Sequence, residues 1–154
     1  MALIIFAVAF KLSLAPFHKW TPDVYAGAPA PIATFLATVA KVATVGLFIR
    51  YLLSSGVILS DSFVIILTII AVLSILAGNL LAVRQVNLKR ILAYSSIAHF
   101  GYLLVAIVSA RNTDFLQVEG FATFEAVNVY VITYVLTTIG AFGAVTLMSS
   151  PYNN

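Results

Sequence analysis

Residues 62–83 read SFVIILTIIAVLSILAGNLLAV and contain no charged side chain. A helix rises about 1.5 Å per residue, so this run is long enough to cross the roughly 30 Å hydrocarbon core of a bilayer. The run shows no alternation of apolar and polar residues, the pattern typical of a membrane β-strand. A helix also satisfies its own backbone hydrogen bonds in lipid. The stretch therefore predicts a transmembrane helix.

The composition of the whole chain supports this prediction. Of its 154 residues, 62% are hydrophobic and only 8% are charged, whereas a soluble domain has about 25% charged residues. The mean hydropathy is +1.10. These values exclude a soluble globular protein, and they exclude a disordered chain, which needs low hydrophobicity and high charge. We expect an all-α integral membrane protein.

Further apolar runs lie on both sides of residues 62–83. Together they predict about five transmembrane helices in one transmembrane unit over residues 1–154. The expected spans are about 1–25, 32–53, 62–83, 91–110 and 126–148. The connectors are short, and the sequence has no tandem repeat or soluble domain. The first run resembles a span whose beginning is missing, so we expect the chain to be a fragment of a longer subunit.

The few charged residues predict the orientation of the spans. The connectors after the first and third spans hold Lys19, Arg84, Lys89 and Arg90, whereas the connectors after the second and fourth are richer in acids. Because basic residues are enriched on the cytoplasmic side, the first and third connectors are expected to face the cytoplasm. The net charge of +3 is too sparse for a nucleic-acid surface.

Cofactor chemistry is not expected in this chain. The sequence contains no cysteine, which excludes disulfides, thiolate zinc sites and cysteine-ligated iron–sulfur clusters. It also has no glycine-rich loop of the kind that binds phosphate groups. We therefore expect neither a metal nor a cofactor to bind these residues.

Lys41 is the most unusual charged residue, because it lies near the middle of the expected span 32–53. A charged lysine at roughly 13 to 14 Å depth cannot easily reach the surface, and it costs about 2.5 to 3.5 kcal/mol on insertion scales. Burial favours the neutral amine, so Lys41 is a candidate for reversible protonation. Small or hydroxylated residues on its helix face favour a polar path: Thr34, Ala37, Thr38 and Thr44. In the alternative, Lys41 is a static counter-ion for a carboxylate outside this chain.

Lys11 is a second candidate for proton transfer, and it depends on Pro16. Proline lacks an amide hydrogen and crowds the carbonyl four residues before it, which predicts a helix break just after Lys11. If Phe17 to about Tyr25 forms a second half-helix, residues 1–25 make one discontinuous span with Lys11 near its centre. Broken membrane helices mark ion sites. In the alternative, the span ends at Ala15 and Lys11 reaches the cytoplasmic surface.

Two histidines are candidate proton relays, since imidazole titrates near pH 6.5. His18 follows Pro16, and His99 lies near the middle of the expected span 91–110. Each has an alternative role. His18 can be an interfacial residue beside Trp20 and Tyr25, and His99 a neutral group that hydrogen-bonds between helices. The fifth span adds hydroxyl groups that either line a water path or pack helices: Tyr130, Thr133, Tyr134, Thr137 and Thr138.

Several longer motifs are specific enough to indicate a family. FKLSLAPFHKWTPDVY at 10–25 is followed by GAPAP at 27–31 and TFLATVAK at 34–41. Further motifs are GNL at 78–80, NLKR at 87–90, YSSIAHFGY at 94–102, GAFG at 140–143 and LMSSPY at 147–152. Together these motifs span nearly the whole chain, and they resemble subunit N of bacterial NADH:quinone oxidoreductase, respiratory complex I.

The resemblance implies an antiporter-like, proton-translocating membrane subunit of about fourteen helices in two inverted bundles, of which this chain looks like the central segment. Lys11 matches the lysine beside the break in the family's seventh helix, and Lys41 matches the lysine of the eighth. His18 and His99 match histidines of the seventh and tenth helices. A glutamate of the fifth helix and a lysine of the twelfth lie outside these residues, so the proton path is incomplete here.

The resemblance also implies a function: a translocase subunit that couples electron transfer from NADH to quinone to proton pumping. NADH, FMN, iron–sulfur clusters and quinone are then expected in other subunits of the complex. The expected partners are the other membrane subunits of complex I and the lipid bilayer, with no nucleic acid, in the bacterial inner membrane. Two other functions remain open: a subunit of a multisubunit sodium/proton antiporter, and a non-transporting structural membrane subunit.

Overall fold

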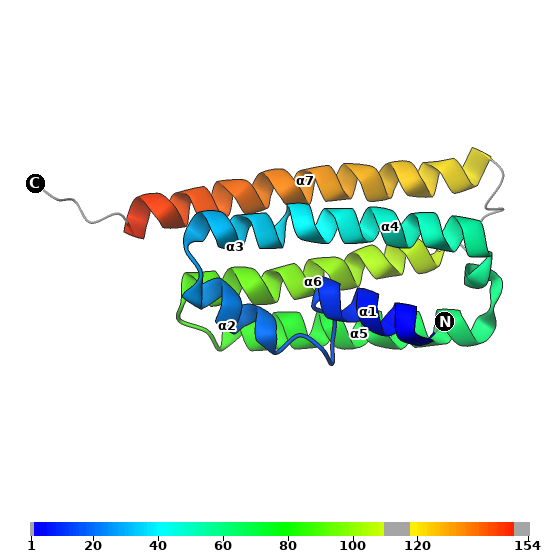
Figure 1. Ribbon diagram of the computed structural model, residues 1–154, viewed down its shortest axis with the longest axis horizontal. Coiled ribbons are helices and arrows are strands. Elements are labelled where there is room, and N and C mark those ends of the chain that lie inside the picture. The colour runs from blue at the N-terminus through cyan, green and yellow to red at the C-terminus, as the bar shows by residue number, and fades with distance from the viewer. Residues whose placement is uncertain (1, 110–117, 150–154) are drawn as a thin grey trace, which may run out of the picture.

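The computed structural model describes residues 2–109 and 118–149, which form a bundle of helices lying side by side (Figure 1). The elements follow one another along the chain as α1 (Ala2–Leu12), α2 (Trp20–Gly27), α3 (Ala30–Ala37), α4 (Val39–Ser55), the 3-10 turn η1 (Val57–Leu59), α5 (Asp61–Val83), α6 (Leu88–Ser109) and α7 (Val118–Ser149). The all-α architecture expected from the sequence is confirmed.

Within the part of the chain that the structure describes, four stretches are long and apolar enough to cross a membrane. They are Ala30–Ser55, Asp61–Val83, Leu88–Ser109 and Glu125–Ser149. The side chains that α5 and α7 turn out of the bundle are large and apolar, as in Ile69, Leu76, Ile132 and Leu136. An apolar outer surface of this kind is typical of helices that face lipid or other membrane helices.

The first predicted span consists of two short helices. α1 ends at Leu12, Ser13 adopts a left-handed conformation with φ 62°, and the Ala15–Pro16 bond is cis. The predicted start of the second half-helix at Phe17 is wrong, since α2 begins at Trp20. The reason is a local turn, in which the Phe17 amide donates to the Leu14 carbonyl at 2.7 Å.

The segment between α1 and α2 is also held from outside. The amide of Ala15 donates a hydrogen bond to Ser74 Oγ of α5 at 2.9 Å, and the Ser74 hydroxyl donates to the Ile70 carbonyl of its own helix. Ser74 is completely buried. Because an unpaired amide inside a membrane protein is costly, this side chain stabilises the irregular backbone.

The second predicted span is longer than 32–53 and is not one regular helix. It covers Ala30–Ser55, and α3 and α4 are separated at Thr38, which has φ −105° and ψ −81°. The sequence contains no proline or glycine at this point, so the break was not predicted. Pro31 lies in the first turn of α3, where its missing amide hydrogen removes no helical hydrogen bond.

α5 and α6 form the closest helix pair. A Cβ atom at Gly78 would lie 2.7 Å from the backbone nitrogen of Ala98, and a Cβ at Gly101 would lie 2.8 Å from Ile75 Cγ1. Contacts this short mean that the two helices touch where they have no side chain. Small residues permit this close approach, which is a common basis for helix association in membranes.

One end of the bundle brings together two connectors, between α2 and α3 and between α5 and α6 (Figure 1). The Nζ atom of Lys89 donates to the carbonyl of Ala28 at 2.9 Å, and Arg90 forms an ion pair with Asp23. Lys19 was expected in a connector, but it lies in the segment between α1 and α2. The basic residues at the start of α6 thus bind the α2 end of the first span.

Candidate functional site around Lys41

Lys41 of α4 is buried within the bundle, with 2% of its surface exposed. Its Nζ atom donates a hydrogen bond to Ser96 Oγ of α6 at 2.6 Å. The same nitrogen lies 4.9 Å from the centre of the Phe100 ring and 6.0 Å from that of Tyr25. Aromatic faces attract a cation, so an ammonium group can stay here with a neutral hydroxyl as its hydrogen-bond acceptor.

Ser96 connects Lys41 to a polar cavity between α6 and α7. The cavity has a volume of about 150 Å³ and is lined by Leu92, Ser95, Ser96, His99, Tyr134, Thr137, Thr138 and Ala141. Liquid water takes up about 30 Å³ per molecule, so a few water molecules fit. The hydroxyl groups supply the polar partners that such waters need.

His99 lies on the same cavity as Ser96. Its Nδ1 atom is 2.7 Å from the hydroxyl oxygen of Tyr130 on α7, and its ring centre is 5.4 Å from that of Tyr134. Which of Nδ1 and the Tyr130 hydroxyl donates depends on the tautomer of the ring. The structure therefore brings Lys41 and His99 together through one serine and one cavity.

Tyr134 of α7 contacts both α3 and α6 next to this site. Its hydroxyl donates a hydrogen bond to the carbonyl oxygen of Ala37 at 3.1 Å. Its ring packs edge-on against Phe100, with 5.1 Å between the ring centres. Tyr134 thus contacts both the break between α3 and α4 and an aromatic neighbour of Lys41.

Lys11 does not join this cluster. It is exposed near the end of α1 and lines a separate cavity of about 300 Å³ between α1 and α4, together with Ala7, Val8, Ala43, Thr44 and Leu47. The cavity that Lys11 lines is therefore separate from the cavity next to Ser96, which residues of α6 and α7 line.

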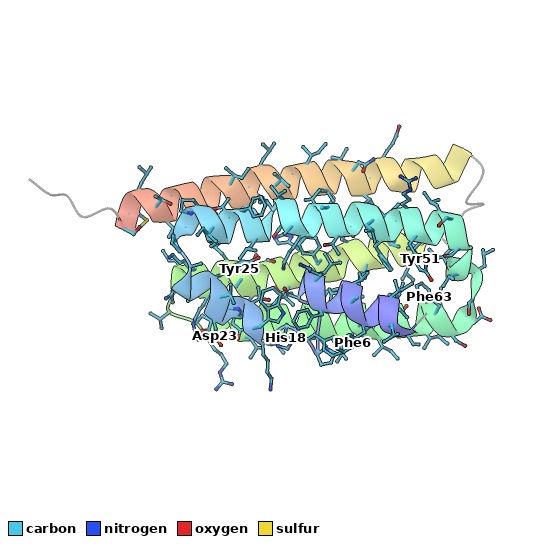
Figure 2. The ribbon with its side chains drawn as sticks, viewed as in Figure 1. Phe6, His18, Asp23, Tyr25, Tyr51 and Phe63 are labelled. Atoms are coloured by element: carbon cyan, nitrogen blue, oxygen red, sulfur yellow. The ribbon has the colours of Figure 1, made fainter. Side chains whose placement is uncertain are left out.

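His18 lies in the segment between α1 and α2 (Figure 2). It is half-buried, and its Nδ1 atom has no hydrogen-bond partner within residues 2–109 and 118–149. Nearby, Trp20 stacks on Phe10. The alternative that set His18 beside an interfacial Tyr25 does not hold for Tyr25, because the Tyr25 side chain is completely buried in the bundle near Lys41.

The threonine stripe next to Lys41 binds its own helix. The hydroxyls of Thr34, Thr38 and Thr44 each donate to the carbonyl four residues earlier. Their hydrogens are therefore already committed to the backbone. The polar group that Lys41 does reach, Ser96, was not predicted as a site residue, although it lies within the YSSIAHFGY motif.

The described residues offer no conventional metal site. Within residues 2–109 and 118–149, no three His, Cys, Asp or Glu side chains gather closely enough to hold a metal ion. The chemistry that the Lys41 site supports is proton binding and transfer, since its polar groups are an amine, an imidazole and several hydroxyls.

These features define a polytopic helical membrane protein with a buried amine beside a polar cavity. The chain belongs to the NADH:quinone oxidoreductase/Mrp antiporter transmembrane family, whose family model matches residues 1–154. The resemblance found from the motifs is thereby confirmed.

Individual relatives agree with the family. The chain is 76% identical over 154 residues to NADH-quinone oxidoreductase subunit N of Acinetobacter baumannii, covering all of this chain and 29% of that protein. It is 55% identical over 151 residues to the subunit N of Psychrobacter arcticus, covering 98% of this chain and 29% of that protein. The chain thus spans about 29% of the length of these curated relatives.

A solved structure also matches. It is respiratory complex I from Thermus thermophilus with bound aureothin, in which one chain superimposes with a TM-score of 0.72 at 37% sequence identity. The match covers 92% of this chain and 28% of the other.

Proposed function

We propose that these residues are part of a proton-translocating subunit N of bacterial NADH:quinone oxidoreductase, and that Lys41 binds and releases a proton during turnover. The names of the relatives support the first part. The second part depends on one observation: a buried amine whose hydrogen-bond partner is the neutral hydroxyl of Ser96.

A neutral partner suits a group that changes its charge. A buried carboxylate would hold the ammonium form, because removing one charge of a buried pair leaves the other uncompensated. A serine hydroxyl accepts a hydrogen bond from the ammonium and can also donate one to the neutral amine. Both protonation states of Lys41 are therefore accommodated at the 2.6 Å contact with Ser96.

The energies involved are of matching size. Moving one proton across a membrane costs about 2.3 kcal/mol per 100 mV. A hydrogen bond to a charged group contributes about 1.5–3 kcal/mol. Making or breaking the contact between Lys41 and Ser96 during the cycle is thus commensurate with the work of pumping.

The other predicted residues take supporting roles in this proposal. His99 exchanges protons with Lys41 through the cavity that it shares with Ser96. Lys11 is a second protonatable amine, on the cavity between α1 and α4, and His18 is a relay within the broken first span. Pro16 is the residue of that break.

The setting is the bacterial inner membrane. NADH, FMN, iron–sulfur clusters and quinone belong to other subunits, and the other membrane subunits of complex I are the protein partners. The connectors after the first and third spans face the cytoplasm. In support of this orientation, the two connectors lie at one end of the bundle, next to Lys89 and Arg90 (Figure 1).

The test of Lys41 compares two substitutions in the assembled complex in inverted membrane vesicles. Lys41→Arg keeps the positive charge but cannot practically deprotonate, whereas Lys41→Ala removes the charge and the exchangeable proton. We expect both variants to lose NADH-driven proton pumping, with normal amounts of assembled complex and normal NADH oxidation by an artificial electron acceptor. Normal pumping by Lys41→Arg would show that Lys41 does not switch its protonation state.

The family description also includes Mrp antiporters, so the transported ion is tested in the same vesicles. We expect NADH-driven acidification to be unchanged when sodium is replaced by potassium. A requirement for sodium would instead favour a sodium/proton antiporter subunit. Normal pumping by Lys41→Ala would favour a structural subunit.

A further inference from the structure

We infer that Tyr134 is a positioning residue, which holds the helix break at Thr38 open and thereby directs Lys41 toward Ser96. This inference rests on the proposed function, because it concerns the placement of the proposed proton-carrying amine. It assigns a role to a hydroxyl on α7 that donates to the backbone carbonyl four residues before Lys41.

The backbone around the break explains why a hydroxyl is needed. The chain crosses the break through hydrogen bonds from the Thr38 amide to the Thr34 carbonyl and from the Val42 amide to the Thr38 carbonyl. In an unbroken helix the carbonyl of Ala37 would accept the amide hydrogen of Lys41. Here Ala37 is the last residue of α3, and its carbonyl accepts the Tyr134 hydroxyl instead.

Tyr134 is well placed to hold this carbonyl. Its side chain is 6% exposed, although few residues of α7 are buried in the bundle. The helix lies along α3 and α4 (Figure 1). The ring is fixed between His99 and Phe100. A hydroxyl anchored by a buried ring supplies the Ala37 carbonyl with a hydrogen-bond donor at the point where α3 ends.

The break determines the direction of the lysine. Successive residues of a helix are rotated by about 100° around its axis, so one irregular residue turns everything after it. Lys41 lies three residues after Thr38. If the break closed into a regular helix, the Lys41 side chain would leave the direction in which its amine meets Ser96 at 2.6 Å.

Few other described groups near the Lys41 amine could stabilise its charged form if the hydrogen bond to Ser96 were lost. Among the side chains that the structure describes, the titratable groups that face Lys41 or its helix from other elements are Tyr25 of α2, Tyr134 of α7, His99 of α6 across the cavity, and Lys11 of α1 on the other side of α4. The described charged groups among them are basic. Loss of the contact with Ser96 therefore disfavours the charged amine.

The test is Tyr134→Phe in the assembled complex, which removes the hydroxyl and keeps the ring. We expect an about tenfold lower rate of NADH-driven proton pumping, the scale of one lost buried hydrogen bond. We also expect the alkaline limb of the pH profile of pumping to move toward acid by about one unit, because a charge-assisted hydrogen bond to the amine is weakened. The amount of assembled complex should be unchanged.

Tyr51→Phe is the matched control, since Tyr51 lies on α4 beyond the site (Figure 2). It should pump at the normal rate with the normal pH profile. A normal rate and profile for Tyr134→Phe would overturn the inference. So would a lower rate with an unchanged profile, which a purely structural role predicts.

Lys41→Ala, measured in parallel, separates this inference from the proposed function. If Lys41→Ala abolishes pumping and Tyr134→Phe does not alter it, only the role of Tyr134 is wrong. If Lys41→Ala pumps normally, the proposed function of Lys41 is wrong, and with it the inference that rests on it.

Discussion

The contact between Lys41 and Ser96 is the smallest unit on which the proposed function depends. Only 2% of the Lys41 surface is exposed. A charged amine buried to this extent is costly without a partner. One hydroxyl and two aromatic rings reduce this cost. They do so without adding a negative charge that would prevent release of the proton.

Ser96→Ala removes the hydroxyl that accepts the hydrogen bond of Lys41. Removing the hydroxyl leaves the Lys41 amine without its acceptor, so the charged form is less stable than in the native protein. We expect an about tenfold lower rate of proton pumping, with the alkaline limb of its pH profile displaced toward acid. Proton pumping in vesicles between pH 6 and about pH 9 measures both effects.

Ser109→Ala is the control for this change. Ser109 lies on the same helix, is exposed, and donates to the Ala106 carbonyl of its own helix. It should leave pumping and the pH profile unaltered. If Ser96→Ala behaves like Ser109→Ala, the hydroxyl of Ser96 has no part in proton binding at Lys41.

At the scale of helices, α5 and α6 form the packed support of the site. α6 carries Ser96, His99 and Phe100, so any shift of α6 moves the partners of Lys41. Its position against α5 is set where Gly78 faces the backbone of Ala98. Two helix backbones in contact have little freedom to adjust, because protein interiors are closely packed.

Gly78→Ala is therefore expected to be destabilising. The added Cβ would lie 2.8 Å from the carbonyl oxygen of Tyr94 and 2.7 Å from the Ala98 nitrogen, so the helices must separate. Overpacking of this kind costs about 1–3 kcal/mol. We expect a lower thermal denaturation midpoint of the purified complex and less of this subunit in the membrane.

The control for the glycine prediction is Gly143→Ala on α7. A Cβ at Gly143 meets nothing within 4 Å among the described residues, and alanine is the better helix former. This variant should be as stable as the native protein. Equal losses in the two variants would mean that the close contact of α5 and α6 does not limit stability.

The two broken helices differ in how far they can be predicted from the sequence. The break near Pro16 has a local cause, since proline lacks the amide hydrogen that a helix interior needs and clashes with the preceding turn. The break at Thr38 has none, because no residue near it is a helix breaker. The group that binds the freed carbonyl of Ala37 is Tyr134, 97 residues away along the chain.

At the scale of the whole molecule, the connectors lie at two ends of the bundle. The connectors between α2 and α3 and between α5 and α6 share one end, and η1 lies at the other (Figure 1). Ion pairing of Arg90 with Asp23 and hydrogen bonding of Lys89 to Ala28 hold the first end together. The orientation in the membrane therefore has two alternatives: the end with Lys89 and Arg90 faces either the cytoplasm or the outer side.

Single cysteines test this orientation, since these 154 residues contain no native cysteine and the unsubstituted complex gives the background of the labelling. Val86→Cys lies between α5 and α6 with the native side chain 97% exposed, and Ser60→Cys lies beyond η1 at the other end. We expect an impermeant maleimide to label Val86→Cys in inverted vesicles and Ser60→Cys in right-side-out vesicles. The reverse pattern would place Lys89 and Arg90 on the outer side.

From the amino-acid sequence we predicted a helical membrane protein, the approximate positions of its apolar spans, and the burial of Lys41 in one of them. Those properties follow from local composition, because lipid accepts only apolar stretches with internally satisfied backbones. The contact of Lys41 with Ser96 and the separate cavity of Lys11 became visible only in the packed bundle. Contacts between helices depend on their mutual rotation and distance, which no single segment encodes.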